Sequence, residues 1–165
     1  MARKCFISYH AEDKAEVDNF TSRFKGEFIL RGSDMDQDII DSTDSDYVMR
    51  RIREKFLADS TVTIVLVGEC TWARRYVDWE VQASLRKPSI GSPNGLVAIQ
   101  LNSTGTNLPE RVQTNVKSGY AKFYKYPASS VDLNVIIEEA FRARTTLQDK
   151  IVNPRDKFSN NRSCP

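Results

Sequence analysis

The stretch from Thr61 to Val67 reads TVTIVLV and decides the fold class. Its residues are apolar or β-branched almost without interruption, whereas a strand with one face in water alternates apolar and polar residues. A run of this kind is typical of a strand that is covered on both faces. Thr61–Val67 is therefore predicted to be the central strand of a parallel sheet.

Other apolar runs precede and follow this strand, and segments of helical length separate them. The additional predicted strands are Lys4–Tyr9, Glu27–Leu30, Leu96–Leu101 and an edge strand at Ala121–Lys125. The predicted helices run from Ala11 to just before Gly26, and over Asp46–Ala58, Ala73–Arg86 and Val131–Leu147. Alternating strands and helices are the pattern of βαβ units. We therefore predict an α/β, flavodoxin-like fold: a five-stranded parallel sheet with helices on both faces.

Length and composition agree with a single domain. The chain has 165 residues, of which 40% are hydrophobic, enough for one sizeable core. Residues 153–165 are polar, contain two prolines and lack periodicity. We predict one domain over residues 1–152 and a polar tail over 153–165 that lies on the surface or is mobile.

The charge balance favours neither nucleic acid nor a membrane as a partner. Lys and Arg number 24 against 22 for Asp and Glu, and the net charge of +2 gives no strong field toward polyanions. No apolar run approaches the roughly 18 residues of a membrane span, and the N-terminus lacks the apolar core of a signal peptide. We expect a cytoplasmic protein.

The chain has three cysteines and one histidine. Cys5, Cys70 and Cys164 show no CxxC spacing, and their odd number argues against a disulfide framework. His10 alone cannot build a multi-histidine metal site, and the acidic loop Arg31–Ser45 lacks the glycine and glutamate positions of a calcium-binding loop. We predict neither a disulfide framework nor a metal site.

Three informative segments follow predicted strands. His10 follows the first strand, the loop Arg31–Ser45 follows the second, and Gly68–Trp72 follows the third. Ligands of parallel sheets bind beyond the carboxyl ends of the strands. We expect the three segments to share one rim of the sheet.

A candidate site residue stands in Thr71–Val81, which reads TWARRYVDWEV. On a helix, Tyr76 and Glu80 are four residues apart and share a face with Trp72. A carboxylate bracketed by aromatic side chains at this rim is a reasonable site. Taken alone, the pattern favours a simpler interpretation, in which the aromatic residues pack and Glu80 pairs with Arg75 or Arg86.

Three segments read together resemble a known family. They are Lys4–His10 (KCFISYH) with Asp13, then Thr61–Val67, then Arg74–Glu80 (RRYVDWE). In this order and spacing they resemble the TIR-like family typified by the NAD-handling TIR component of bacterial Thoeris antiphage systems. In TIR domains, an aromatic or aliphatic pair precedes Ser-Tyr or Ser-Phe in the first strand. The helix after strand three carries an aromatic residue, three intervening residues and then the catalytic glutamate.

The resemblance covers roughly Ala2–Leu101 and implies an enzyme. It implies a TIR-like NAD glycohydrolase or ADP-ribosyl cyclase that releases nicotinamide and makes an ADP-ribose-derived, cyclic signal. The signal would activate a separate effector protein in antiphage defence. NAD would be the substrate, no further cofactor would be needed, and the domain would be able to self-associate.

The resemblance also implies roles for individual residues. Glu80 is the expected catalytic residue. The expected substrate-binding residues are Ser8, Tyr9, His10, Asp36, Trp72 and Tyr76. Backbone amides where the first strand meets its helix are expected to hold the pyrophosphate. By position alone, Ser8 and Tyr9 suit core packing equally well.

Two other functions remain open. One is a non-catalytic TIR-like binding or scaffold module, with Glu80 in a structural ion pair. The other is a nucleoside deoxyribosyltransferase-like enzyme, which also uses a glutamate on a similar fold. The first is favoured if Glu80 is bound to an arginine at the surface, and disfavoured if it points into a cleft beneath the Arg31–Ser45 loop.

Overall fold

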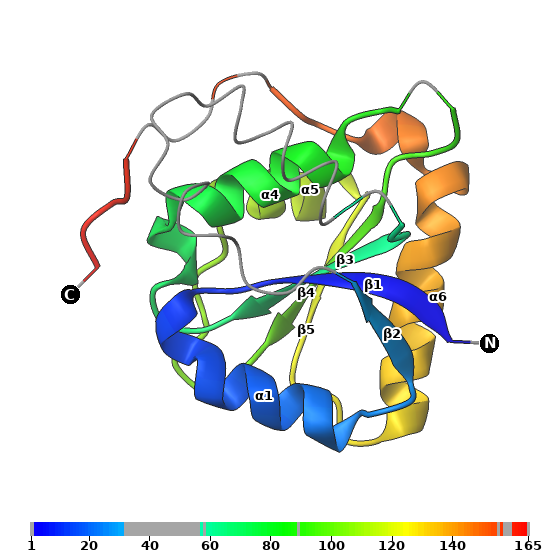
Figure 1. Cartoon of the computed structure of the whole chain (residues 1–165). Coiled ribbons are helices and arrows are strands. Elements are labelled where there is room, and N and C mark those ends of the chain that lie inside the picture. The colour runs from blue at the N-terminus through cyan, green and yellow to red at the C-terminus, as the bar shows by residue number, and fades with distance from the viewer. Residues whose placement is uncertain are drawn as a thin grey trace.

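The computed structural model describes residues 2–31, 57, 59–88, 90–154, 156 and 160–164. Within these residues, five parallel strands form one sheet in the order β2-β1-β3-β4-β5 (Figure 1). The strands are β1 (Arg3–Ser8), β2 (Phe28–Arg31), β3 (Val62–Val67), β4 (Gly95–Gln100) and β5 (Lys122–Tyr124). The predicted α/β, five-stranded parallel fold is confirmed, with β5 at an edge.

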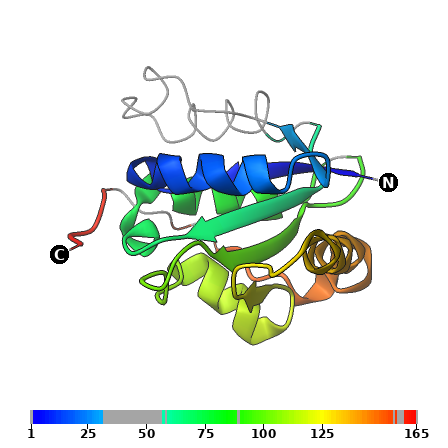
Figure 2. The same cartoon turned by 90° about the horizontal axis from the view of Figure 1, so that it is seen from below.

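Helices cover both faces of this sheet, α4 and α5 on one side and α1 and α6 on the other (Figures 1 and 2). They are α1 (Lys14–Arg23), α4 (Arg75–Leu85), α5 (Glu110–Ser118) and α6 (Ser130–Thr146), with short 3₁₀ turns η1 (Ala11–Asp13), η3 (Thr71–Ala73) and η4 (Gln148–Lys150). The predicted helix Asp46–Ala58 lies almost wholly outside the described residues. Among the helices that the structure describes, none has the length and apolar character that a membrane crossing needs.

Strand β3 is the central strand, as its sequence predicts. It pairs with β1 on one side and β4 on the other, and all six of its residues are buried. Ile64 and Leu66 belong to the core cluster under α1 and α6, whereas Val65 and Val67 belong to the cluster under α4 and α5. Because neighbouring residues of a strand point to opposite faces, a strand between two helical layers needs apolar side chains, or hydrogen-bonded ones such as Thr63, at every position.

Helix α5 is absent from the sequence predictions. Its nine residues, ERVQTNVKS, offer two valines as the only aliphatic residues of an amphipathic stripe, and its buried positions include Arg111 and Asn115. The available signals are at its ends: Pro109 stands before the helix, and Gly119 follows it in the left-handed conformation with φ of 91°. Both are typical helix boundary residues. Terminal signals predict this helix better than hydrophobic periodicity does.

A disulfide joins Cys70 to Cys164, so the prediction against disulfides was wrong. The two residues are 94 positions apart, which leaves no local spacing by which to predict the pairing. Cys70 follows the end of β3, and the described part of the C-terminal tail returns along α4 to reach it. The tail thus lies on the surface of α4 at these positions. Cys5 is buried and free.

Strand β4 and α6 pack closely at Gly95. A Cβ atom on Gly95 would lie 2.0 Å from the carbonyl oxygen of Ala140, a backbone atom that cannot rotate away. We expect Gly95→Ala to lower the free energy of unfolding by about 1–3 kcal/mol, the usual cost of overpacking a core. Urea denaturation followed by circular dichroism measures this change. An unchanged midpoint would mean that the α6 backbone shifts without cost.

Candidate functional site

Glu80 meets the end of β1. It lies on α4 with 5% of its surface exposed, and the Ser8 hydroxyl donates to its Oε1 at 3.3 Å. Ser8 is the last residue of β1, so the contact joins two of the three segments that carry the family resemblance. The structure therefore places the candidate glutamate at the carboxyl end of the sheet, where ligands of parallel sheets bind.

The side chains of β1 point alternately to the two faces of the sheet, and this decides which of them reach Glu80. Cys5 and Ile7 belong to the core cluster under α1 and α6, and Tyr9 packs against the same cluster. Ser8 points the other way, toward α4. The structure thus brings Ser8 to Glu80 and leaves Tyr9 on the opposite face.

Burial governs the electrostatics of Glu80. Loss of water around the carboxyl group raises the pKa of Glu80 well above its ordinary 4.5, and the hydrogen bond from Ser8 offsets only part of this shift. Within the described residues, no arginine or lysine forms an ion pair with Glu80. The Arg75 guanidinium, one candidate partner, lies over the Trp79 ring at 5.3 Å from its centroid. An ion pair between Glu80 and a surface arginine would favour a structural role for the glutamate, and the described residues form no such pair.

A series of buried hydrogen bonds holds the backbone of Glu80 in place. Ser84 Oγ donates to the Glu80 carbonyl oxygen at 2.8 Å and is 2.6 Å from the Thr63 hydroxyl on β3. The Asn94 amide donates to Thr63 Oγ1 at 3.1 Å. Buried and mutually satisfied hydrogen bonds of this kind hold one geometry. The turn of α4 that carries Glu80 is therefore attached to the sheet.

Tyr76 connects α4 to the start of the first helical segment. Its hydroxyl oxygen accepts a hydrogen bond from the Ala11 amide at 3.1 Å. Burial raises the pKa of Tyr76, and the nearby Glu80 carboxylate adds to the shift. Tyr76 and Glu80 are four residues apart on α4, a spacing that puts them on the same face of the helix. The Ala11 amide, one of those expected to hold a pyrophosphate, donates to Tyr76 here.

Trp72 does not share a helix with Glu80, contrary to the sequence prediction. It lies half-buried in η3, and Arg74, with φ of −97° and ψ of 124°, interrupts the chain between η3 and α4. The extended conformation at Arg74 ends the 3₁₀ turn and restarts the helix at the next residue. The i, i+4 relation from Trp72 to Tyr76 is therefore lost, because it requires continuous helix.

Two further polar side chains lie at this rim. His10 is 8% exposed, and its Nδ1 has no hydrogen-bond partner within the described residues; its Nε2 is 3.5 Å from Glu12. Asp13 lies against Gly68, where an added Cβ would be 2.2 Å from Asp13 Oδ2. Burial raises the pKa of Asp13. Asp13 was not among the predicted site residues, although it stands in the first resembling segment.

Asp36 lies outside the described residues, as does the Arg31–Ser45 loop beyond Arg31. Among the described residues, no group of three or more histidine, cysteine, aspartate or glutamate side chains is arranged to hold a metal ion.

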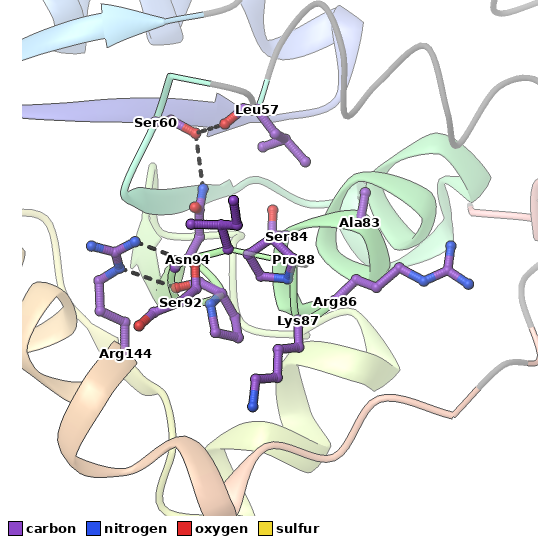
Figure 3. A pocket seen from close by; sticks show the side chains of 13 residues that line it. Leu57, Ser60, Ala83, Ser84, Arg86, Lys87, Pro88, Ser92, Asn94 and Arg144 are labelled. Carbon is purple, nitrogen blue, oxygen red and sulfur yellow. Dashed lines mark hydrogen bonds between the residues drawn. The ribbon is translucent and has the colours of Figure 1, made fainter.

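A cavity of about 590 Å³ lies at the other end of the sheet, where the chain enters β3 and β4 (Figure 3). Ser60, Asn94 and Arg144 line it. Their polar groups are already bonded: Asn94 donates to Ser60 Oγ at 2.9 Å, and Arg144 Nε donates to the Pro93 carbonyl at 3.1 Å. Glu80 does not line this cavity, so we assign the candidate site to the carboxyl ends of β1 and β3 instead.

The raised pKa of Glu80 predicts a pH dependence of stability. Between the ordinary value of 4.5 and the raised value, the folded protein holds a proton that the unfolded chain has lost. The folded state binds more protons in this window, so we expect the free energy of unfolding to decrease as pH rises through it. Glutamine does not titrate, so we expect the free energy of unfolding of Glu80→Gln not to show this decrease. The measurement is the denaturant midpoint of both proteins at a series of pH values from 4 upward. If the two midpoints change in parallel with pH, the raised pKa of Glu80 is contradicted.

A comparison with known protein families identifies the family of the chain. The family model described as "Thoeris protein ThsB, TIR-like domain" matches residues 6–106. This range contains Ser8, Tyr76 and Glu80. No curated protein matches the chain.

Proposed function

Because this chain belongs to the TIR-like domain family of Thoeris protein ThsB, an antiphage defence family, we propose that it cleaves the nicotinamide glycosidic bond of NAD. The observation that carries the proposal is the burial of Glu80 between the end of β1 and Tyr76, without a cation paired to it in the described residues. Because no cation of the described residues neutralises this carboxylate, it would pair with the positive charge of the substrate. Glu80 would be the catalytic residue.

The chemistry needs little more than one carboxylate. Nicotinamide leaves NAD as a neutral molecule, so no general acid is required at the leaving group. The ribose becomes oxocarbenium-like in the transition state, as in glycoside hydrolysis. Glu80 would stabilise that developing positive charge and orient the ribose hydroxyls, with the greatest effect where water is excluded.

The raised pKa of Glu80 suits this role. The nicotinamide ring of NAD carries a positive charge, and an opposite charge nearby favours the ionised form of a carboxyl group. Substrate binding would therefore lower the pKa of Glu80 and ionise it when it is needed. In the free protein, burial penalises the charged form of the group.

The other expected site residues would bind the substrate during this step. Tyr76 and Trp72 would offer aromatic faces to the nicotinamide or ribose, and Ser8 and His10 would contact the substrate near the end of β1. When an adenine or ribose nucleophile reaches the anomeric carbon before water, a cyclic ADP-ribose product forms. We propose that this chain acts in the cytoplasm, that such a signal activates a separate effector protein, and that no cofactor besides the substrate NAD takes part.

Product analysis tests the proposal. The purified protein is incubated with NAD, with and without a lysate of phage-infected cells, and the products are resolved by liquid chromatography and mass spectrometry. We expect nicotinamide release, with a partner product whose mass and retention separate ADP-ribose from a cyclic isomer. Cleavage of deoxynucleosides instead would indicate the deoxyribosyltransferase-like enzyme. A folded protein that binds NAD without cleaving it would indicate the binding module.

A further inference from the structure

The C-terminal tail is attached to α4 at two places. The inner anchor comprises Val152, Asn153, Pro154 and Asp156, which contact α4 and α5. The outer anchor comprises Asn161, Arg162 and Cys164, which contact the start of α4 and the end of β3. The described end of the tail lies beside the start of α4 in Figure 1.

The inner anchor is bonded to two buried side chains of α5, Arg111 and Asn115. Arg111, 6% exposed, donates to the carbonyl oxygens of Pro154 and Asp156 at 2.7 and 2.6 Å and to Asn153 Oδ1 at 3.0 Å. The Asn115 side chain exchanges two hydrogen bonds with the backbone of Val152. Charge-assisted bonds such as those of Arg111 are among the stronger hydrogen bonds of proteins.

The outer anchor has the opposite character. Two of its hydrogen bonds are solvent-exposed: the Arg75 amide donates to Asn161 Oδ1 at 2.9 Å, and Arg74 Nη2 donates to the Arg162 carbonyl at 2.8 Å. The Arg162 amide donates to the Ala73 carbonyl at 2.8 Å. Exposed hydrogen bonds exchange readily with water and contribute little net stability. The Cys70–Cys164 bond is the covalent link that fixes the outer anchor to the end of β3.

The outer anchor completes the N-terminus of α4. The first amides of a helix have no partner within it, and a side-chain oxygen of the residue before the helix usually accepts one of them. Arg74, which precedes α4, makes no such bond. Asn161 of the tail supplies the missing acceptor to Arg75. The first turn of α4 thus depends on a residue 86 positions away.

We propose that Cys70 and Cys164 form a redox latch, in which the disulfide holds the outer anchor on the first turn of α4 and reduction releases it. The inner anchor keeps the rest of the tail in place, so the released thiols stay at high effective concentration and the latch is reversible. Both cysteines are half-buried and within reach of a small thiol or disulfide. In a reducing compartment, such disulfides are usually transient and redox-sensing.

A low-molecular-weight disulfide such as oxidised glutathione is the oxidant that forms the Cys70–Cys164 bond. One cysteine thiolate attacks the small disulfide, which releases one small thiol and leaves a mixed disulfide on the protein. The second thiolate then attacks the mixed disulfide, which forms the Cys70–Cys164 bond and releases the second small thiol. Two electrons pass from the protein thiols to the small disulfide. Cys5 does not compete, because it is fully buried and burial raises its pKa to about 12.

The latch acts on the site through Tyr76. Tyr76 lies in the first turn of α4, whereas Glu80 lies in the next turn and is held by Ser8 and the Ser84 hydrogen bond. Release of the outer anchor therefore loosens the substrate-contacting aromatic more than the carboxylate. On the proposed function, reduction raises the KM for NAD severalfold and leaves kcat within about twofold.

Hydrogen exchange of the whole chain tests the latch without any activity. With oxidised glutathione, mass spectrometry of a digest is expected to recover Cys70 and Cys164 in one linked peptide. Reduction is expected to speed amide exchange at Arg75 on the order of tenfold, by local opening of the first turn. The amide of Asp132, which Ser129 Oγ caps at the start of α6, is the matched control and should not change. Cys164→Ser should exchange like the reduced protein with or without reductant.

The outcomes separate the two proposals. Equal exchange at Arg75 in both redox states, or no linked peptide under oxidising conditions, overturns the latch. A redox-dependent exchange without NAD cleavage in either state supports the latch and counts against the proposed function. A redox-dependent kcat with constant KM overturns the route through Tyr76.

Discussion

Glu80→Gln is expected to lower the rate of nicotinamide release from NAD by roughly 10²- to 10³-fold, the usual cost of losing one preorganised charge-stabilising group. Glutamine has nearly the same shape and still accepts the hydrogen bond from Ser8, but it cannot carry the negative charge that offsets an oxocarbenium-like ribose. Because the loss concerns the transition state, kcat should fall and KM should change little. Initial rates over a range of NAD concentrations measure both.

A control at the same rim separates this effect from a general loss of negative charge. Glu69 is exposed beside Cys70 and follows the same strand, so Glu69→Gln removes one carboxylate from the rim and leaves Glu80 in place. We expect it to keep activity within about twofold. Full activity in Glu80→Gln would remove the catalytic role of Glu80, and an equal loss in both variants would point to the overall field of the rim.

Arg111→Ala is expected to lower the free energy of unfolding by about 3–5 kcal/mol, because it removes the guanidinium that is paired with the buried Asp78 carboxylate. Arg111 Nε donates to Asp78 Oδ1 at 2.8 Å, and the two side chains are 4% and 5% exposed. The same variant removes the bonds that hold the inner anchor of the tail. Denaturant unfolding at neutral pH, with the disulfide intact, measures the change.

An exposed ion pair provides the matched control. Lys14 and Asp18 are 3.2 Å apart on α1, with 54% and 62% of their side chains exposed. Pairs of this kind contribute well under 1 kcal/mol, since water screens them. We therefore expect Lys14→Ala to leave the unfolding midpoint nearly unchanged. A loss in Arg111→Ala no larger than in Lys14→Ala would mean that water or another side chain replaces the guanidinium beside Asp78.

Both predictions concern the same helix. Glu80 and Asp78 are two residues apart on α4 and point to different neighbours: Glu80 to Ser8 on β1, and Asp78 to Arg111 on α5. The tail adds a third set of contacts, at the first turn. Helix α4 therefore carries the candidate catalytic residue and also joins the sheet, α5 and the tail. Changes in any of these neighbours are expected to reach the site through the position of α4.

Local sequence patterns predicted most of the fold because hydrophobic periodicity is a local property. The run of apolar residues over Thr61–Val67 predicted a strand buried on both faces, and the alternation of strands and helices predicted the parallel sheet. The spacing of Tyr76 and Glu80, together with the first strand, predicted the family. Helix α5 was not predicted, because its buried positions include polar side chains and its sequence therefore shows no apolar stripe.

The tertiary structure decided what depends on distant partners. The contact of Ser8 with Glu80 spans 72 positions, and the disulfide spans 94, distances at which no sequence spacing carries information. The break at Arg74, which separates Trp72 from α4, lies next to the tail residues that bind there. The sequence by itself thus determined the fold class, the family and the identity of the candidate glutamate. Only the folded chain determined the burial of that glutamate, and hence its raised pKa, because desolvation depends on every neighbour that excludes water.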